Sequence, residues 1–241
     1  MLMVTLLMRI RLSVYFYCLL VLFAVFSFLA PKYKIESAAM TLFSVNSFLY
    51  GFYISPILGG QKSRIDELHK LVRSEANVLF SIMLKVKNAD KHVSKEIKIL
   101  IESYINACIS ERKSAQGEKQ YEALIRYCVN YTGDSTEVKQ VLDQLVSNES
   151  NRTSIAMQLN NKVYANEWWI MLVLFSITLS FVAVMNIGES WILKLVQALL
   201  CTGLTMLLVI LLKLSTLTHK KAKLIWEPYK KLLETNFHQI D

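Results

Sequence analysis

Four long apolar blocks constrain the fold of this chain more than any other feature of its sequence. They cover about 13–30, 38–57, 168–187 and 191–212. A helix of roughly 20 mostly apolar residues can cross the ~30 Å hydrocarbon core of a bilayer. Hydrophobic residues make up 54% of the 241 positions and are concentrated in these blocks. The sequence therefore predicts an integral, multi-pass membrane protein.

The first block could be a cleaved signal peptide or a retained membrane anchor. Arg9 and Arg11 precede it, as the basic residues of a signal peptide would. The apolar run is long, however, and Phe28-Leu29-Ala30 lacks the small-x-small cleavage pattern. We expect a retained anchor.

Basic residues near the ends of the blocks predict the orientation. They precede the first block and follow the second and the fourth, and lysine and arginine favour the cytosolic side of a membrane. Both termini and the segment 58–166 are then cytosolic. The net charge is +8, and most of the surplus of basic over acidic residues lies next to the predicted spans. This placement favours contact with anionic lipid heads over binding of nucleic acid. The basic residues concerned are Arg9, Arg11, Lys62, Arg64, Lys70, Arg73, Lys213, Lys220, Lys221 and Lys223.

The segment 58–166 has the apolar spacing of a helical bundle. We expect helices over about 62–88, 93–114 and 118–131, and a fourth that begins with Asp134 as its N-cap and Glu137 three residues later. The polar run 147–154 could break this fourth helix. Pro56 could separate the second block from the helix 62–88, or could leave the two nearly continuous.

The predicted fold class is therefore all-α: a four-span integral membrane protein with a cytosolic helical bundle between spans two and three. The expected parts are 1–57 with the first two spans, 58–166 as the bundle, 167–213 with the last two spans, and 214–241 as a cytosolic amphipathic tail.

No motif for catalysis, for a cofactor or for a metal ion is apparent. The sequence lacks a Gly-rich phosphate loop, HExxH, CxxC and a nucleophile elbow. Its four cysteines have no metal-binding or disulfide spacing, so we expect free thiols. Glu75 lies in the middle of a predicted helix and could be either a buried ion-pair partner or exposed. We expect that the protein is not an enzyme, with no catalytic residues, no cofactor and no metal.

One face of the second block combines hydroxyl groups with aromatic rings. At about 100° per residue, Thr41, Ser44, Phe48, Phe52 and Ser55 share an arc of roughly 80°. The two phenyl rings lie in the middle of this arc, with hydroxyls at both ends. We predict that these five residues line a pore, in which Phe48 and Phe52 form an apolar neck. Lys32 and Lys34 would then bias an outer vestibule towards anions.

The alternative is that this part of the chain only packs against other helices. Ser47, Gly51 and Ser55 form a small-xxx-small ladder that allows a second helix to approach closely. Ser176 and Ser180 form a similar pair in the third block. We predict that Ser47, Gly51, Ser176 and Ser180 belong to helix-packing seams, and that Asn46, on the far side of the second block, has a hydrogen-bond partner.

A series of residues along the chain follows the order seen in one known family. They are Gly51-Phe52, Arg64, Glu75-Ala76-Asn77-Val78-Leu79, Tyr104, Glu111, Arg152, Trp168 and Pro228. In this order the chain resembles the bacterial bestrophin-like domain family, over about 41–233. It departs from the family at Glu111-Arg112-Lys113, where a Trp-Pro pair is common, and at residues 217–221, where the family has an Asp-Pro-Phe-x-Gly-like element.

The resemblance implies a distant relation to bestrophins, which are pentameric anion channels whose second span lines the pore. The function expected for this chain is an oligomeric channel that conducts small anions. The resemblance also implies a pentamer and, because the family is bacterial, a location in a bacterial inner membrane. The rival hypothesis is a non-conducting membrane scaffold or sensor whose cytosolic helices bind a protein partner that the sequence does not identify.

Overall fold

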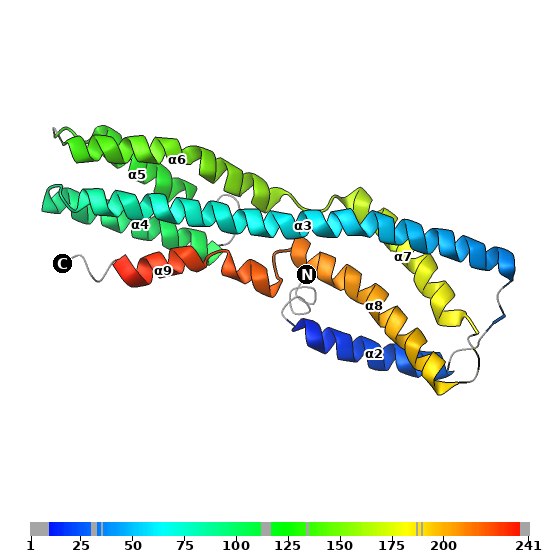
Figure 1. The fold of residues 1–241 in the computed structure, drawn as a ribbon. Helices are drawn as coiled ribbons and strands as arrows, with labels where there is room; N and C mark the ends of the chain where they lie inside the picture. Colours follow the sequence, from blue (N-terminus) through cyan, green and yellow to red (C-terminus); the bar gives the residue numbers. More distant parts are fainter. Residues whose placement is uncertain are drawn as a thin grey trace. The chain divides into compact units, whose positions relative to one another are not determined.

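The computed structural model describes residues 10–29, 33, 34, 36–111, 117–133, 135–186, 188 and 190–236. These residues are helical almost throughout, and within them the only strand-like contact is an isolated bridge between Tyr33 and Met185 (Figure 1). The expected all-α class is confirmed. The helices are α2 Leu12–Leu29, α3 Ser37–Val86, α4 Lys91–Glu111, α5 Glu118–Asn130, α6 Thr136–Asn160, α7 Ala165–Val184, α8 Trp191–Ser215 and α9 Glu227–Asn236, with a 3-10 helix η1 Lys220–Leu224 before α9.

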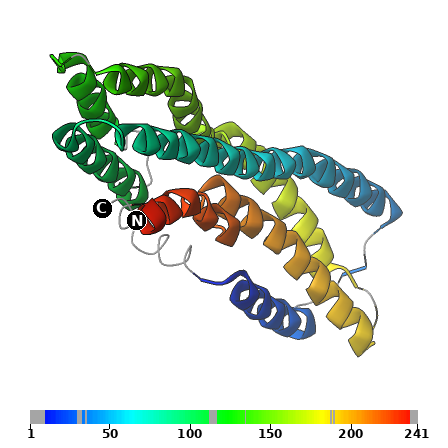
Figure 2. The same ribbon diagram turned by 60° about the vertical axis from the view of Figure 1, so that its left-hand side comes forward.

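The chain forms two compact units. The first comprises Met1–Ser63 and Lys162–His219, and the second comprises Arg64–Asn161 and Lys220–Asp241. The first unit thus contains α2, the first part of α3, α7 and α8, while the second contains the rest of α3 with α4, α5, α6, η1 and α9 (Figures 1 and 2).

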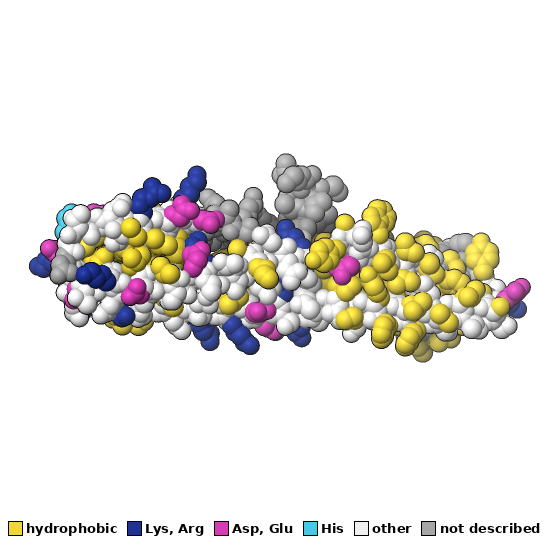
Figure 3. Space-filling view, turned by 90° about the horizontal axis from the view of Figure 1, so that it is seen from above, with side chains coloured by type: hydrophobic (Ala, Val, Ile, Leu, Met, Phe, Trp, Pro, Cys, Tyr) yellow, Lys and Arg dark blue, Asp and Glu magenta, His cyan; other side chains and the backbone are white. Residues whose placement is uncertain are grey.

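Four candidate membrane-spanning helices occur in the described chain, as the sequence predicts. They are Leu12–Leu29, Ser37–Val86, Trp191–Ser215 and a segment within Thr136–Val184, whose apolar part is α7. Most side chains in these segments are not buried by the protein. On the face shown in Figure 3, hydrophobic side chains cover much of the first unit, and charged side chains gather mainly on the second. This apolar surface marks the chain as a membrane protein.

Polar side chains join the helices of the first unit where they face one another. Asn46 of α3 donates to the Leu174 carbonyl (3.0 Å) and to the Thr178 hydroxyl (2.8 Å) of α7. In the same unit, Ser27 of α2 donates to Gln197 of α8 at 2.7 Å. Hydrogen bonds of this kind hold helices together where no water competes. The partner expected for Asn46 is therefore present.

Helix α3 is continuous from Ser37 to Val86, through Pro56 and the Gly59-Gly60 pair. The sequence left open whether Pro56 would end the span. Proline costs a helix one hydrogen bond and brings its ring near the preceding turn. Because Pro56 is exposed, its ring displaces no buried side chain. The spanning segment and the first helix of the bundle are one element.

The second unit is a helical bundle around a closely packed apolar core. Helix α6 differs from the prediction at its start, and it is continuous where the sequence left a break open. Its N-cap is Ser135, whose hydroxyl accepts from the Val138 amide at 3.3 Å, rather than Asp134, which lies outside the described residues. The polar run 147–154 causes no break. The core residues with no exposed surface are Leu68, Val72, Leu79, Ile82, Ile97, Ile101, Ile105, Tyr121, Leu124, Val141 and Leu145.

Candidate functional site

The five predicted pore-lining residues share one exposed face of α3. Thr41, Ser44, Phe48, Phe52 and Ser55 are all exposed within the single chain. The side chains of Phe48 and Phe52 are 69% and 71% exposed, and their rings stack with centroids 6.0 Å apart and an interplanar angle of 19°. The two rings therefore form one continuous apolar surface along this face.

The opposite face of the same segment is occupied by contacts within the chain. Tyr50 and Ile54 are buried against Met171 of α7 and Leu211 of α8. The Tyr50 ring also packs near the Phe175 ring, with the two ring centroids 6.1 Å apart. Because α3 packs through this side, the phenyl-bearing face is left for lipid, for a second chain or for a water-filled path.

The predicted seam residues do not pack closely within one chain. A side-chain carbon added at Gly51 would meet no atom within 4 Å, and Ser176 and Ser180 are exposed. Ser47 is half-buried, and its buried hydroxyl has no hydrogen-bond partner among the described residues. A close helix–helix approach at these residues would need another copy of the chain, so the seam stays a prediction about assembly.

The residues predicted for the outer vestibule are only partly described. Lys34 is exposed and lines a shallow hollow with Glu36, Ser180 and Phe181. Lys32 lies outside the described residues. The carboxylate of Glu36 in the same hollow weakens any positive potential that Lys34 provides.

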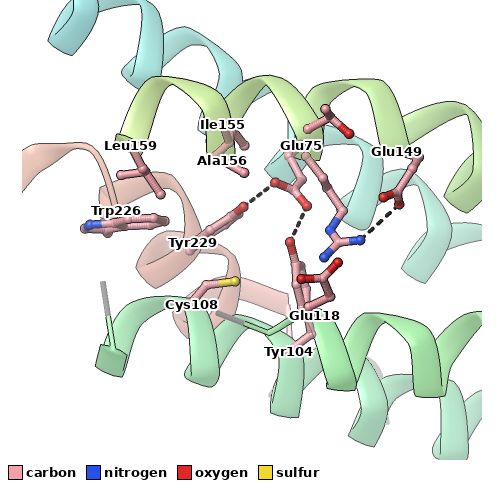
Figure 4. Close-up of a pocket in the computed structure, with 12 residues that line it drawn as sticks. Glu75, Tyr104, Cys108, Glu118, Glu149, Ile155, Ala156, Leu159, Trp226 and Tyr229 are labelled. Carbon is pink, nitrogen blue, oxygen red and sulfur yellow. Dashed lines mark hydrogen bonds and ion pairs between the residues drawn. The ribbon is translucent and has the colours of Figure 1, made fainter. Parts of the chain in front are cut away.

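The second unit contains a site that the sequence did not predict, centred on the carboxyl group of Glu75. This side chain is 1% exposed. Tyr104 of α4 donates to Oε1 at 2.5 Å, and Tyr229 of α9 donates to Oε2 at 2.6 Å (Figure 4). Asn148 of α6 donates to Oε1 at 3.4 Å. One carboxyl group therefore joins α3 to three other helices of the bundle.

A second charge, the guanidinium of Arg152, lies beside this network. Its Cζ is 3.8 Å from the centroid of the Tyr121 ring and 5.6 Å from that of Tyr104. The same guanidinium pairs with Glu149 at 3.0 Å. Planar stacking together with a carboxylate partner fixes arginine more firmly than lysine could be fixed.

Burial dominates the electrostatics of the network. It raises the pKa of Glu75, because a charged carboxylate is disfavoured away from water, and the three hydrogen bonds and Arg152 only partly offset this effect. Burial and the charge of Glu75 also raise the pKa values of Tyr104 and Tyr229 well above the usual value. Both phenols therefore keep their protons and act as donors to Glu75.

A cavity of about 260 Å³ opens beside these groups. Glu75 and Tyr229 lie in its wall with the aromatic ring of Trp226, and Glu118 and Glu149 are exposed around it (Figure 4). The thiol of Cys108 also faces it, and burial raises the pKa of that thiol to about 12. The cavity is lined by Glu75, Tyr104, Cys108, Glu118, Glu149, Arg152, Thr153, Ile155, Ala156, Leu159, Trp226 and Tyr229.

The sequence contained only a weak signal for this cluster. Glu75, Tyr104 and Arg152 stand out as positions of the family resemblance, but their separation in the sequence does not show that they meet. For Glu75 alone, burial and exposure were both open, and the structure shows that it is buried. Tyr229 is next to Pro228, another position of the resemblance, and was not singled out.

The predicted free thiols are also seen. Cys18, Cys108, Cys128 and Cys201 form no disulfide within the chain. Within the described residues no group of three or more His, Cys, Asp or Glu side chains is placed to hold a metal ion.

Comparison with known proteins agrees with the resemblance seen in the sequence. The sequence profile described as the Bestrophin-like domain matches residues 12–219. This range includes the first apolar helix, which the resemblance did not, and ends before Pro228. Among curated proteins and among solved structures, no match to this chain is found. Since the match covers most of its length, the chain belongs to the bestrophin-like domain family.

Proposed function

We propose that the protein is an oligomeric membrane channel that conducts small anions and is not an enzyme. The observation that carries this proposal is the exposed face of α3, where Phe48, Phe52 and three hydroxyl-bearing residues lie together. Membership of the bestrophin-like domain family supports it.

Several copies of the chain must surround a common axis for this face to line a pore. One helix face cannot enclose a path for ions, and identical chains close most readily into symmetric rings. The distant relation to bestrophins suggests a pentamer. The small residues Ser47, Gly51, Ser176 and Ser180 would provide the close approach between neighbouring chains.

The chemistry of the face favours anions over cations. The edge of an aromatic ring carries partial positive charge, and the five residues Thr41, Ser44, Phe48, Phe52 and Ser55 include no carboxylate. A ring of phenyl groups makes an apolar constriction that can close by losing its water. Lys32 and Lys34 would add positive charge at the outer entrance.

The proposal includes an orientation in the membrane. Both termini and the second unit lie in the cytosol, where the basic residues that follow the spans meet anionic lipid heads. A bacterial inner membrane is the proposed location.

A membrane scaffold or sensor is the second candidate. It is favoured by apolar side chains that the second unit leaves exposed, among them Val129 (60%), Val146 (59%) and Met157 (67%). Exposed apolar surface on a cytosolic bundle can bind a protein partner. Such a protein would need no pore.

The experiment that tests the channel is halide flux into liposomes that contain the purified protein. Replacing both rings, Phe48→Ala with Phe52→Ala, should widen and wet the neck and so raise the flux per assembled oligomer. If the rings only pack between chains, the change costs roughly 3–5 kcal/mol for each ring and lowers assembly without creating flux.

The matched control is Leu42→Ala with Leu49→Ala. These two side chains are also apolar and exposed on α3, but they point about 100° away from the phenyl rings. We expect the control to leave flux unchanged. An absence of halide flux from both the native protein and a correctly assembled double-phenylalanine variant would leave only the scaffold.

A further inference from the structure

We propose that the cavity of the second unit binds a small organic cation, whose ammonium group lies beside the Glu75 carboxylate and against the rings of Trp226 and Tyr229. The proposal concerns this unit alone and does not depend on anion conduction.

The charges around the cavity favour a positively charged ligand. Three carboxyl groups line it, those of Glu75, Glu118 and Glu149, against the single guanidinium of Arg152. That guanidinium is already paired with Glu149 and stacked on the Tyr121 ring. An anionic ligand would be repelled by the exposed carboxylate of Glu118 and disfavoured beside Glu75, whereas a cation would be attracted to both groups.

The carboxyl group of Glu75 can accept a further hydrogen bond. A carboxylate offers about four acceptor positions. Tyr104 and Asn148 donate to Oε1, while Oε2 accepts from Tyr229. Among the described residues Tyr229 is the donor seen at Oε2, which leaves one position there for a donor or a charge inside the cavity.

The aromatic rings supply the second contact that an organic cation needs. Trp226 and Tyr229 are 7% and 1% exposed, and their ring centroids lie 5.9 Å apart with an interplanar angle of 31°. Leu159 continues the same wall (Figure 4). A methylated ammonium group pairs with such a wall through cation–π contact and through its methyl groups.

A bare metal ion fits the same cavity poorly. Divalent cations need several oxygen, nitrogen or sulfur ligands around one point. The described residues contain no such group of three His, Cys, Asp or Glu side chains. The apolar wall of Ile155, Leu159 and Trp226 suits carbon rather than a hydration shell.

Binding of a cation should be coupled to loss of a proton. Burial raises the pKa of Glu75, and a cation beside it would stabilise the ionised form and lower that pKa again. Affinity should therefore rise with pH through the range in which Glu75 ionises. Calorimetry in two buffers with different ionisation enthalpies would measure the released proton.

The test uses choline chloride and its neutral isostere, 3,3-dimethyl-1-butanol, which has carbon in place of the quaternary nitrogen. Each is titrated calorimetrically into the full-length protein in a maltoside detergent. We expect saturable binding of choline with one site per chain and none of the alcohol. Methylammonium chloride, the second cation probe, distinguishes recognition by Glu75 from recognition by the rings.

Two variants and one control locate the site. Glu75→Gln removes the charge but keeps one carbonyl oxygen, which can still accept from one of the two tyrosines, and Trp226→Leu removes the ring. Each should lower the affinity for choline by about tenfold or more. Glu122→Gln, an exposed residue of α5 that does not line the cavity, should leave it unchanged. Circular dichroism confirms that each variant is folded.

Three results would overturn the proposal. One is the absence of saturable binding of either cation at millimolar concentration. Another is equal binding of choline and the alcohol, which would make the cavity an apolar site. The third is unchanged choline affinity in folded Glu75→Gln and Trp226→Leu proteins.

Discussion

Gly117 lies against the ring of Tyr104, so the space that this glycine leaves helps to position a residue of the Glu75 cluster. Its φ of 69° lies in the left-handed region at the N-cap of α5, a conformation that is unfavourable for residues with a side chain. A side-chain carbon there would lie 2.6 Å from the ring of Tyr104, the residue that donates to Glu75. The turn before α5 and the position of Tyr104 therefore depend on the same glycine.

We predict that Gly117→Ala destabilises the protein by about 1–3 kcal/mol, through backbone strain and through displacement of the Tyr104 ring. Thermal unfolding followed by circular dichroism measures the change. Gly60→Ala is the control, because Gly60 is an exposed helical residue with open space around it. It should be neutral or stabilise α3 by about 0.5–1 kcal/mol. Equal stability of the two variants would contradict the role given to Gly117.

The elements of the second unit are held together by polar contacts within an apolar core. Helix α6 continues through the polar run 147–154 because Asn148 turns inward, where it donates to Tyr121 at 3.2 Å and to Glu75. Glu75 itself links α3 to α4, α6 and α9. An inward-facing polar residue with partners costs little, whereas the same residue without partners would be expensive.

The raised pKa of Glu75 gives the unit a pH dependence with a definite sign. A carboxyl group whose folded pKa exceeds its unfolded value favours folding below the unfolded pKa, near 4.5, and this contribution is lost as the pH rises through the folded value. Tyr104, Tyr229, Arg152 and Cys108 face the same group and keep their own protons over this range.

We therefore predict that Glu75→Gln becomes relatively more stable as the pH rises. Glutamine mimics the protonated carboxylic acid but cannot ionise, so the variant does not lose this contribution to stability as the pH rises. The difference between the midpoints of thermal unfolding of the variant and the native protein, measured between about pH 5 and pH 8, should shift in favour of the variant. A constant difference would show that Glu75 is already ionised in the folded protein throughout this window, so that its pKa is not raised into it, and a shift in the opposite direction would show that its pKa is lowered.

At the scale of the whole molecule, the distribution of basic residues predicts which parts face the cytosol. In a background that lacks Cys18, the exposed native cysteine, we predict that Lys62→Cys and Lys220→Cys resist an impermeant thiol reagent added to intact cells. Ser190→Cys, between α7 and α8, should react. The three substitutions serve as controls for one another, and the reverse labelling pattern would overturn the proposed orientation.

The sequence by itself determined the helical class, the apolar helices and their approximate ends. These features follow from local rules, because hydrophobic periodicity, turn residues and the length needed to cross a bilayer all act over neighbouring residues. The face of α3 with Phe48 and Phe52 was also predictable, since helical geometry alone places these side chains together.

Only the tertiary structure decided which distant residues meet. Glu75, Asn148 and Tyr229 lie on helices far apart in the sequence, and their burial depends on partners that no local pattern encodes. The continuity of α3 through Pro56 was likewise seen only in the structure. The intact α6 was decided by the bundle, because packing and buried hydrogen bonds outweigh the local preference for a break. The sequence specified the helices, and the contacts between them created the cavity.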